Sequence, residues 1–130
     1  LAFVPKEDFE MRTFTKLIHG LSGTAEILGM DLKVQEHGRQ TWEFLATGTT
    51  TRVTLKSVFT HPTTGHEETG GILGTGDTAG ADIQEIDLTQ NELTIVNFNM
   101  KLEHVRCTYD DDGGGAMTGS LFIKATTAKG

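Results

Sequence analysis

Cysteine and long apolar stretches are scarce in this 130-residue chain, and each shortage excludes a class of protein. The single cysteine, Cys107, cannot form an internal disulfide or a multi-cysteine zinc site. No window of about 18 apolar residues occurs, so the sequence predicts no membrane span. A chain of this length is expected to form a single domain, residues 1–130, that buries roughly two-thirds of its unfolded surface.

Lysine and arginine are absent between Ser57 and Met100, and this absence locates the charge of the protein. The net charge is −7, from 11 basic and 18 acidic residues. Seven acids lie in the segment without bases, so the remainder, with 11 residues of each sign, is neutral. Such a segment repels phosphate backbones, and direct nucleic-acid binding is not expected. We interpret it as a solvated acidic face, with a cation site or a channel lining for an anionic polymer as alternatives.

Threonine, with 21 residues, and glycine, with 16, dominate what is present. Threonine favours strands and glycine favours turns, and apolar residues recur with a period of two. We therefore predict an all-β fold, a single-domain antiparallel sandwich or small barrel of roughly eight strands. Residues 1–8 and 126–130 are expected to be tails. The expected strands are Phe9–Ile18, Ile27–Gln35, Thr41–Thr47, Arg52–Phe59, Ile83–Leu88, Leu93–Glu103, Val105–Tyr109 and Ala116–Ala125.

The alternation also predicts which side chains face the core, and it leaves one element open. The stretch Ile83–Leu88 suits a short helix as well as a strand. Cys107 alternates with Val105 and Tyr109 and is expected to be buried. The other inward-facing residues are expected to be Leu28, Met30, Leu32, Val34, Trp42, Phe44, Ala46, Val53, Leu55, Phe59, Val96, Phe98, Met100, Leu102, Met117, Leu121 and Ile123.

A glycine-rich segment, residues 61–82, is predicted to be a long loop that contacts a neighbouring copy of the chain. Loops of this length inside a compact domain are more often functional than plain connections. The motif GTGDTAG, residues 74–80, lacks a preceding hydrophobic strand, a following helix and a lysine, so it is not a phosphate-binding loop. The residues proposed for self-association are Gly70, Gly71, Ile72, Leu73, Gly74 and Gly76.

His61 and His66 flank the sequence PTTG, which has the residues of a hairpin turn, and Glu67 follows. Side chains that flank such a turn face one another. Two imidazoles and a carboxylate could form a zinc site with an open position, which a metal-dependent enzyme would use. The alternative interpretation is that these are polar residues at an exposed turn.

Asp110, Asp111 and Asp112 run directly into three glycines in the stretch YDDDGGGAMTG. Calcium prefers oxygen ligands, so a calcium site is one interpretation. Adjacent residues of an extended chain point in alternating directions, however, and the spacing of an EF-hand loop is absent. The other interpretation is a plain turn of the final hairpin, between the strands Val105–Tyr109 and Ala116–Ala125.

Three hypotheses for function follow, and apart from the metal ion of the third no cofactor is expected. The first is a non-enzymatic structural subunit that forms homo-oligomers in a virion, a tail or secretion tube, or a surface filament. The second is a small β-barrel that binds an apolar small molecule. Its cavity would be lined by Met30, Trp42, Phe44, Phe59, Phe98 and Met100. The third is the metal-dependent enzyme built on His61 and His66.

The first residue is leucine, which indicates cleavage of a longer precursor or a trimmed form. Removal of a secretion signal and processing of a structural protein are both consistent with it. The expected location is therefore extracellular or in a virion.

Overall fold

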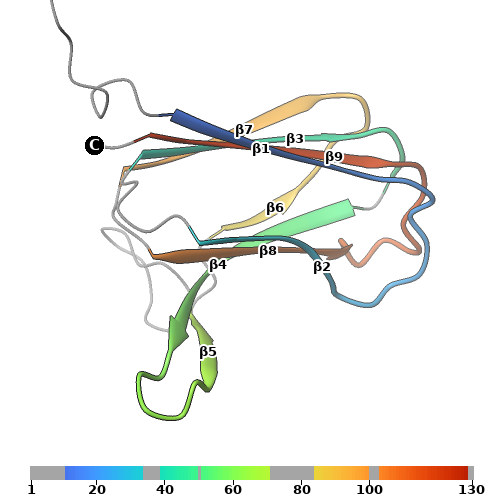
Figure 1. Cartoon of the computed structure of the whole chain (residues 1–130). Helices are drawn as coiled ribbons and strands as arrows, with labels where there is room; N and C mark the ends of the chain where they lie inside the picture. The colour runs from blue at the N-terminus through green and yellow to red at the C-terminus, as the bar shows by residue number, and fades with distance from the viewer. Residues whose placement is uncertain (1–10, 34–38, 50, 71–83, 100–102, 129–130) are drawn as a thin grey trace, which may run out of the picture.

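The computed structural model describes residues 11–33, 39–49, 51–70, 84–99 and 103–128, and these form nine β-strands (Figure 1). The strands are β1 (Met11–Ile18), β2 (Ile27–Lys33), β3 (Arg39–Ala46), β4 (Thr51–Thr60), β5 (Glu67–Gly70), β6 (Gln84–Asp87), β7 (Leu93–Asn99), β8 (His104–Asp111) and β9 (Leu121–Ala128). No helix occurs in this part of the chain, so the all-β prediction is confirmed.

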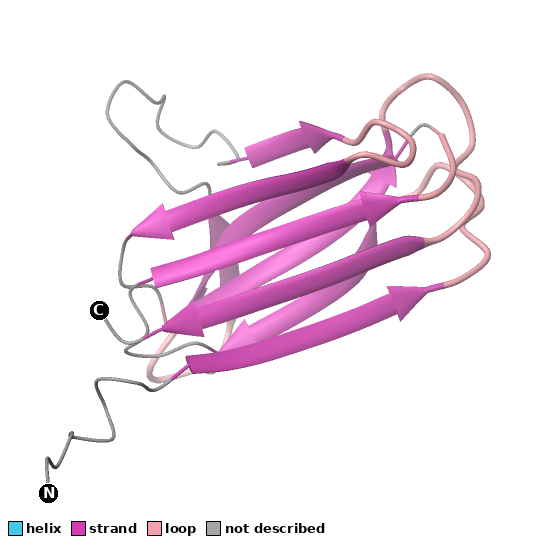
Figure 2. Cartoon of the chain, turned by 90° about the horizontal axis from the view of Figure 1, so that it is seen from above, coloured by secondary structure: helices cyan, strands magenta, loops and turns pink. Residues whose placement is uncertain are grey.

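Two open antiparallel sheets lie face to face (Figures 1 and 2). Sheet A has the strand order β1-β9-β3-β7. Sheet B has the order β2-β8-β4-β5, and β6 also pairs with β4. Because β5 and β6 pair with successive parts of the same edge of β4, together they fill one strand position. The chain thus fills eight positions in the order of a jelly roll, and of the two predicted architectures the sandwich is the one present.

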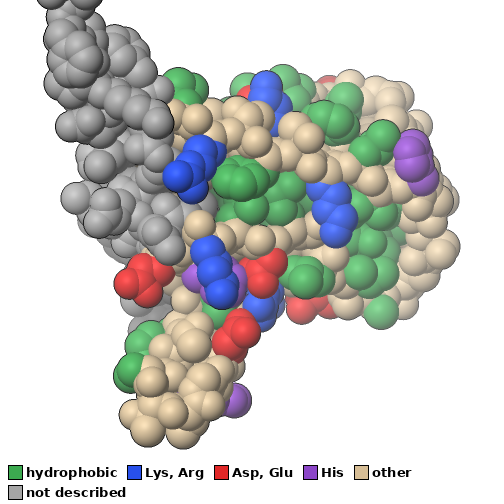
Figure 3. All heavy atoms as spheres, viewed as in Figure 1, with side chains coloured by type: hydrophobic (Ala, Val, Ile, Leu, Met, Phe, Trp, Pro, Cys, Tyr) green, Lys and Arg blue, Asp and Glu red, His purple; other side chains and the backbone are tan. Residues whose placement is uncertain are grey.

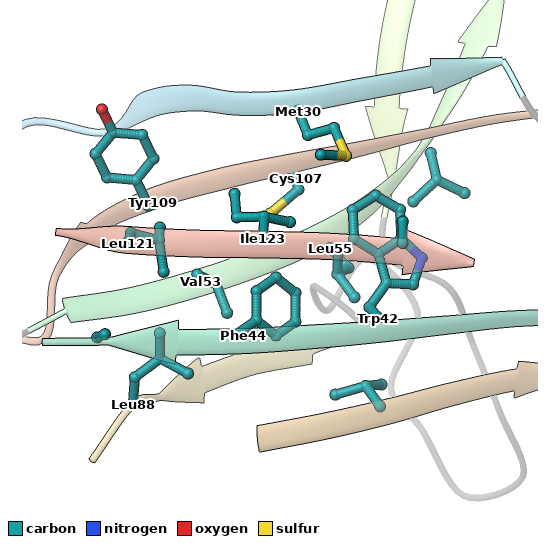
Figure 4. Packing of buried hydrophobic residues seen from close by; sticks show 14 of the residues in the cluster. Met30, Trp42, Phe44, Val53, Leu55, Leu88, Cys107, Tyr109, Leu121 and Ile123 are labelled. Carbon is teal, nitrogen blue, oxygen red and sulfur yellow. The ribbon is translucent and has the colours of Figure 1, made fainter. Parts of the chain in front are cut away.

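The core lies between the inner faces of the two sheets (Figure 4). Trp42 and Phe44 on β3 are fully buried, and their rings stack with centroids 6.2 Å apart. The indole Nε1 of Trp42 donates a hydrogen bond to Oε1 of Gln40 at 3.2 Å, so its polar atom is satisfied inside the core. Burial also raises the pKa of the Cys107 thiol to about 12, which keeps the sulfur neutral. The predicted burial of Trp42, Phe44 and Cys107 is confirmed.

Two predicted core residues are exposed, each for a local reason. A β-bulge between Leu28 and Met30 leaves Gly29 unpaired and turns Leu28 outward, where it is 49% exposed. Phe59 is 59% exposed because β4 leaves the sandwich after Ser57, the last residue that pairs with β8. Three of the six residues proposed for a ligand cavity, Met30, Trp42 and Phe44, lie in the packed core. The side chains of Val34, Phe98, Met100 and Leu102 lie outside the described residues.

Several element boundaries differ from the prediction. Residues 67–70 of the predicted long loop form strand β5. The strand predicted at Ile83–Leu88 is confirmed as β6, and the helical alternative is not the one present. Strand β9 runs on to Ala128, so residues 126–128 are part of sheet A and not of a tail. Residues 1–8, predicted to be a tail, lie outside the described residues.

The stretch from Asp112 to Ser120 is a connection between the two sheets and not the turn of a hairpin. It joins β8 of sheet B to β9 of sheet A, strands that do not pair with each other. The connection is held by bonds to neighbouring loops. Met117 N–H donates to the carbonyl of Gly23 at 3.0 Å, and Thr47 N–H donates to the carbonyl of Ser120 at 2.9 Å. Turn residues mark a change of direction, but they do not specify which strands pair afterwards.

Gly48 provides a test of this loop contact. A Cβ at residue 48 would overlap the backbone carbonyl of Thr118, which cannot move independently of the connection. Gly48→Ala is expected to lower the free energy of unfolding by about 1–3 kcal/mol through overpacking, measured by denaturant unfolding. The control is Gly70→Ala, where a Cβ meets no atom within 4 Å. Equal free energies of unfolding for the two variants would contradict the close contact between residue 48 and the backbone of Thr118.

Candidate functional site

A hairpin arm, residues 57–70, projects from the sandwich (Figure 1). It consists of the end of β4, a turn and β5, and Phe59 lies directly opposite Glu68 in its register. His61 N–H donates to the carbonyl of His66 at 2.7 Å, and Gly65 N–H donates to the carbonyl of His61 at 2.9 Å. The predicted turn at residues 61–66 is confirmed.

The residues proposed for a zinc site each have other partners. Nδ1 of His61 accepts hydrogen bonds from the backbone N–H groups of Thr63 and Thr64, at 3.2 and 3.3 Å. His66 Nε2 lies 2.9 Å from Oε1 of Glu68, and Glu67 accepts a hydrogen bond from Arg106. Within the described residues, no group of three or more His, Cys, Asp and Glu side chains is placed to hold a metal ion.

The three aspartates also diverge. Asp111 and Asp112 accept hydrogen bonds from the N–H groups of Gly113 and Gly114, at 3.2 and 2.9 Å. These are the bonds of aspartates that stabilise their own turn. Asp110 lies opposite Arg52 on β4. Partial burial raises the pKa of Asp110, and neighbouring carboxylates add to this effect, although the charge of Arg52 opposes it.

The proposed self-association loop lies almost entirely outside the described residues. Gly70 is the last residue of β5 and lies opposite Ser57. The remaining five residues, Gly71, Ile72, Leu73, Gly74 and Gly76, fall in the undescribed segment.

A charged network anchors the arm to the outer face of sheet B. Arg106 on β8 donates hydrogen bonds to Asp31 on β2 and to Glu67 in the arm, each at 2.9 Å. His104, which is buried, contacts the other oxygen of the Asp31 carboxylate through Nε2. Figure 3 shows acidic, basic and histidine side chains gathered where the arm meets the sandwich. Because Arg106 contacts both β2 and β5, it fixes the base of the arm.

Several acidic residues between Ser57 and Met100, the segment that has no lysine or arginine, lie beside arginines of β4 and β8. Glu67 pairs with Arg106, while Asp87 accepts a hydrogen bond from Arg52 at 2.7 Å and Glu85 lies 3.9 Å from the same guanidinium. The register of sheet B places Arg52 opposite Asp87. The described part of the acidic segment is thus largely paired, and its charge does not form a continuous acidic lining.

The outer face of sheet A is different, because apolar side chains cross it in an unbroken row. Leu17 lies opposite Phe122, Phe122 opposite Leu45, and Leu45 opposite Leu93. The row crosses all four strands, and directly opposite residues in antiparallel strands share a face. Ile95 extends it along β7. We call these five residues, Leu17, Leu45, Leu93, Ile95 and Phe122, the apolar ladder.

Most of the ladder is exposed: the values are 49% for Leu17, 56% for Leu93, 53% for Ile95 and 38% for Phe122. The sequence analysis missed this surface, because it followed only the alternating inward positions. The sequence contained an indication of it at Leu121, Phe122 and Ile123. Successive side chains of a strand alternate between the two faces, so with Leu121 and Ile123 in the core, Phe122 must point outward. The same reasoning applies to Leu45, between Phe44 and Ala46.

Comparison with known proteins identifies the fold and no family. No family model matches the chain, and no curated protein matches it. The SPBc2 prophage-derived protein YomS is similar in structure, with a TM-score of 0.54, 15% identity, and coverage of 91% of this chain and 94% of that one. A chain of the Bacillus endospore appendages, which form disulfide-linked pili, has a TM-score of 0.51, 10% identity, and coverage of 100% and 98%. At these identities the likeness establishes the fold alone.

The described residues contain no helix long and apolar enough to cross a membrane.

The Asp31 network predicts a pH dependence of stability. Partial burial raises the pKa of Asp31, but hydrogen bonds from Arg106 and His104 outweigh it, so the pKa is lowered from 3.8. The stabilisation is therefore present above pH 3.8 and is lost as the pH falls through the lower pKa of the folded state. Asp31→Asn is expected to lower the free energy of unfolding at pH 7 by about 1–2 kcal/mol. Denaturant unfolding between pH 7 and pH 2 should show the difference from the wild type closing below pH 3.8.

Glu26→Gln is the control for this measurement. Glu26 pairs with Lys56 at 3.5 Å, but half of its side chain is exposed, so its loss is expected to change stability by less than about 0.5 kcal/mol. A pH-independent difference between Asp31→Asn and the wild type would show that the carboxylate charge is not what stabilises the network.

Proposed function

We propose that the protein is a non-enzymatic structural subunit that self-associates into a larger assembly, in a virion, a tail or secretion tube, or a surface filament. The observation that carries this proposal is the apolar ladder. The largest contiguous apolar patch on a protein surface is often a functional contact site. Here large apolar side chains from every strand of sheet A form one row, in which Leu45 is half-buried and the others are exposed.

The size of the ladder face predicts the strength of the contact. A four-stranded sheet of eight-residue strands presents a face of roughly 500 Å², from the usual strand spacing and rise. Stable pairwise complexes bury about 800 Å² on each partner. One contact through this face is therefore weak, and a stable assembly requires several contacts per subunit, as repeated structures provide.

The structural likeness to YomS and to the endospore appendages supports the proposal only through the fold, which a phage protein and a pilus subunit also have. The cysteine content of this chain does not suit the disulfide links of such pili. Cys107 is the only cysteine of this sequence and is fully buried, so these residues offer no exposed thiol for a disulfide between copies. An assembly of this kind places the protein outside the cell or in a virion.

Sedimentation of the purified chain tests the proposal. At micromolar concentration we expect a concentration-dependent shift to species larger than the monomer. Leu17→Glu, which puts a charge into the ladder, is expected to weaken this association by roughly tenfold or more. The matched control is Leu28→Glu, because Leu28 is also 49% exposed but lies on β2 in the other sheet. A wild-type chain that stays monomeric at every salt concentration and pH would end the proposal.

A further inference from the structure

The arm exposes an aromatic side chain that takes no part in the fold. Phe59 is 59% exposed, and its neighbours on the same arm face are Glu68, directly opposite, and His61 and His66 next along the strands. The other arm face carries Glu67, which bonds to Arg106 on sheet B. One face of the arm is therefore used inside the subunit, and the face with Phe59 points away from that contact.

We propose that the arm of one copy docks on the apolar ladder of the next copy, with Phe59 packed against Phe122 and Leu17. The inference rests on the proposed function and specifies it, because it names the two surfaces that meet. Aromatic side chains, including Phe, are enriched at the centre of protein interfaces, and charged residues are more common at the rim. The ladder is the apolar row that such an aromatic side chain requires.

Charge complementarity selects this partner. The outer face of sheet A carries two bases, Arg39 and Lys124, and one acid, Glu43, whereas the whole chain has a net charge of −7. Lys124 lies two residues from Phe122, on the same face and directly opposite Glu43. By the register of its strands this outer face therefore has a net charge of one positive unit. The face of the arm that holds Phe59 carries the carboxylate of Glu68, which lies 2.9 Å from His66 Nε2. The two surfaces thus carry opposite net charges when His66 is neutral.

The positions of the two surfaces make the contact intermolecular. The ladder lies where β1 ends and β9 begins. Strand β4 starts at that end of the sandwich, and the arm is its far end (Figure 1). The two surfaces also belong to different sheets. One chain cannot bring its own arm to its own ladder, so each copy offers one surface of each kind.

Contacts between two different surfaces are heterologous and propagate. Each copy that binds through its ladder still presents a free arm, so the assembly grows into a ring or an open filament, according to the rotation between copies. A contact of ladder against ladder would instead be isologous and would close at a dimer. The two arrangements make different predictions for mixtures of variants.

The experiment uses the full chain in two variants, Phe59→Ala in the arm and Phe122→Glu in the ladder. Each variant alone is expected to sediment as a monomer, with association weakened by roughly tenfold or more. Mixed in equal amounts at the highest concentration at which the wild type is studied, they are expected to shift towards a heterodimer and to form nothing larger, because one intact arm meets one intact ladder through a single weak contact. Thr69→Ala, a truncation on the other side of the arm, is the control and should assemble as the wild type does.

The alternative results are distinct. If Phe59→Ala assembles like the wild type, or if the mixture stays monomeric while the wild type assembles, the docking inference is overturned and the proposed function stands. If the wild type itself is monomeric, both are overturned. Circular dichroism and thermal unfolding of each variant confirm that the chain is folded before the mixture is read.

A charge exchange provides a second readout. Glu68→Lys and Lys124→Glu are each expected to weaken assembly, whereas a chain with both changes should regain it, because the opposite charges again face each other between copies. Added salt should reduce the difference between the single and double variants. A double variant weaker than both single variants would contradict the pairing of these two residues.

Discussion

Burial of two sheet faces against each other is the constraint on which the rest of this structure depends. Each strand of the sandwich must place apolar side chains at every second position, as Trp42, Phe44 and Ala46 do on β3. The chain meets this requirement by crossing repeatedly between the sheets, which forms the jelly roll. Since the inner faces supply the hydrophobic core, the residues of the two outer faces contribute less to the stability of the domain.

The outer faces of the two sheets differ in the side chains that they carry. On sheet B, cations of β4 and β8 pair with acids from distant parts of the chain, as Arg106 does with Asp31 and Glu67. The exposed pair between Arg106 and Glu67 contributes little to stability and orients the arm, whereas Asp31, bonded to Arg106 and to the buried His104, stabilises the sheet. On sheet A, apolar side chains occupy outward positions where polar ones would serve solubility better. This departure from the usual pattern is the strongest indication of a contact with another molecule.

The two candidate contact surfaces belong to opposite ends of the domain, and this separation matters for assembly. In the proposed assembly, a copy with a projecting arm at one end and an apolar row at the other repeats without a disulfide link. The buried, neutral thiol of Cys107 fits such an arrangement, because a single cysteine of this kind is a packing residue and not a crosslink. Strength then comes from the number of contacts in the assembly.

The sequence by itself determined the class of the fold, the strand content and most of the core, because the period of two depends only on which neighbouring residues are apolar. It also located the turn at residues 61–66 from proline and glycine. The tertiary structure alone decided which strands pair. The connection after Asp112 joins two sheets, and a bulge moves Leu28 outward, since pairing depends on residues far apart in the chain. The ladder arises for the same reason: Leu17, Leu45, Leu93 and Phe122 become one surface only when β1, β9, β3 and β7 lie side by side.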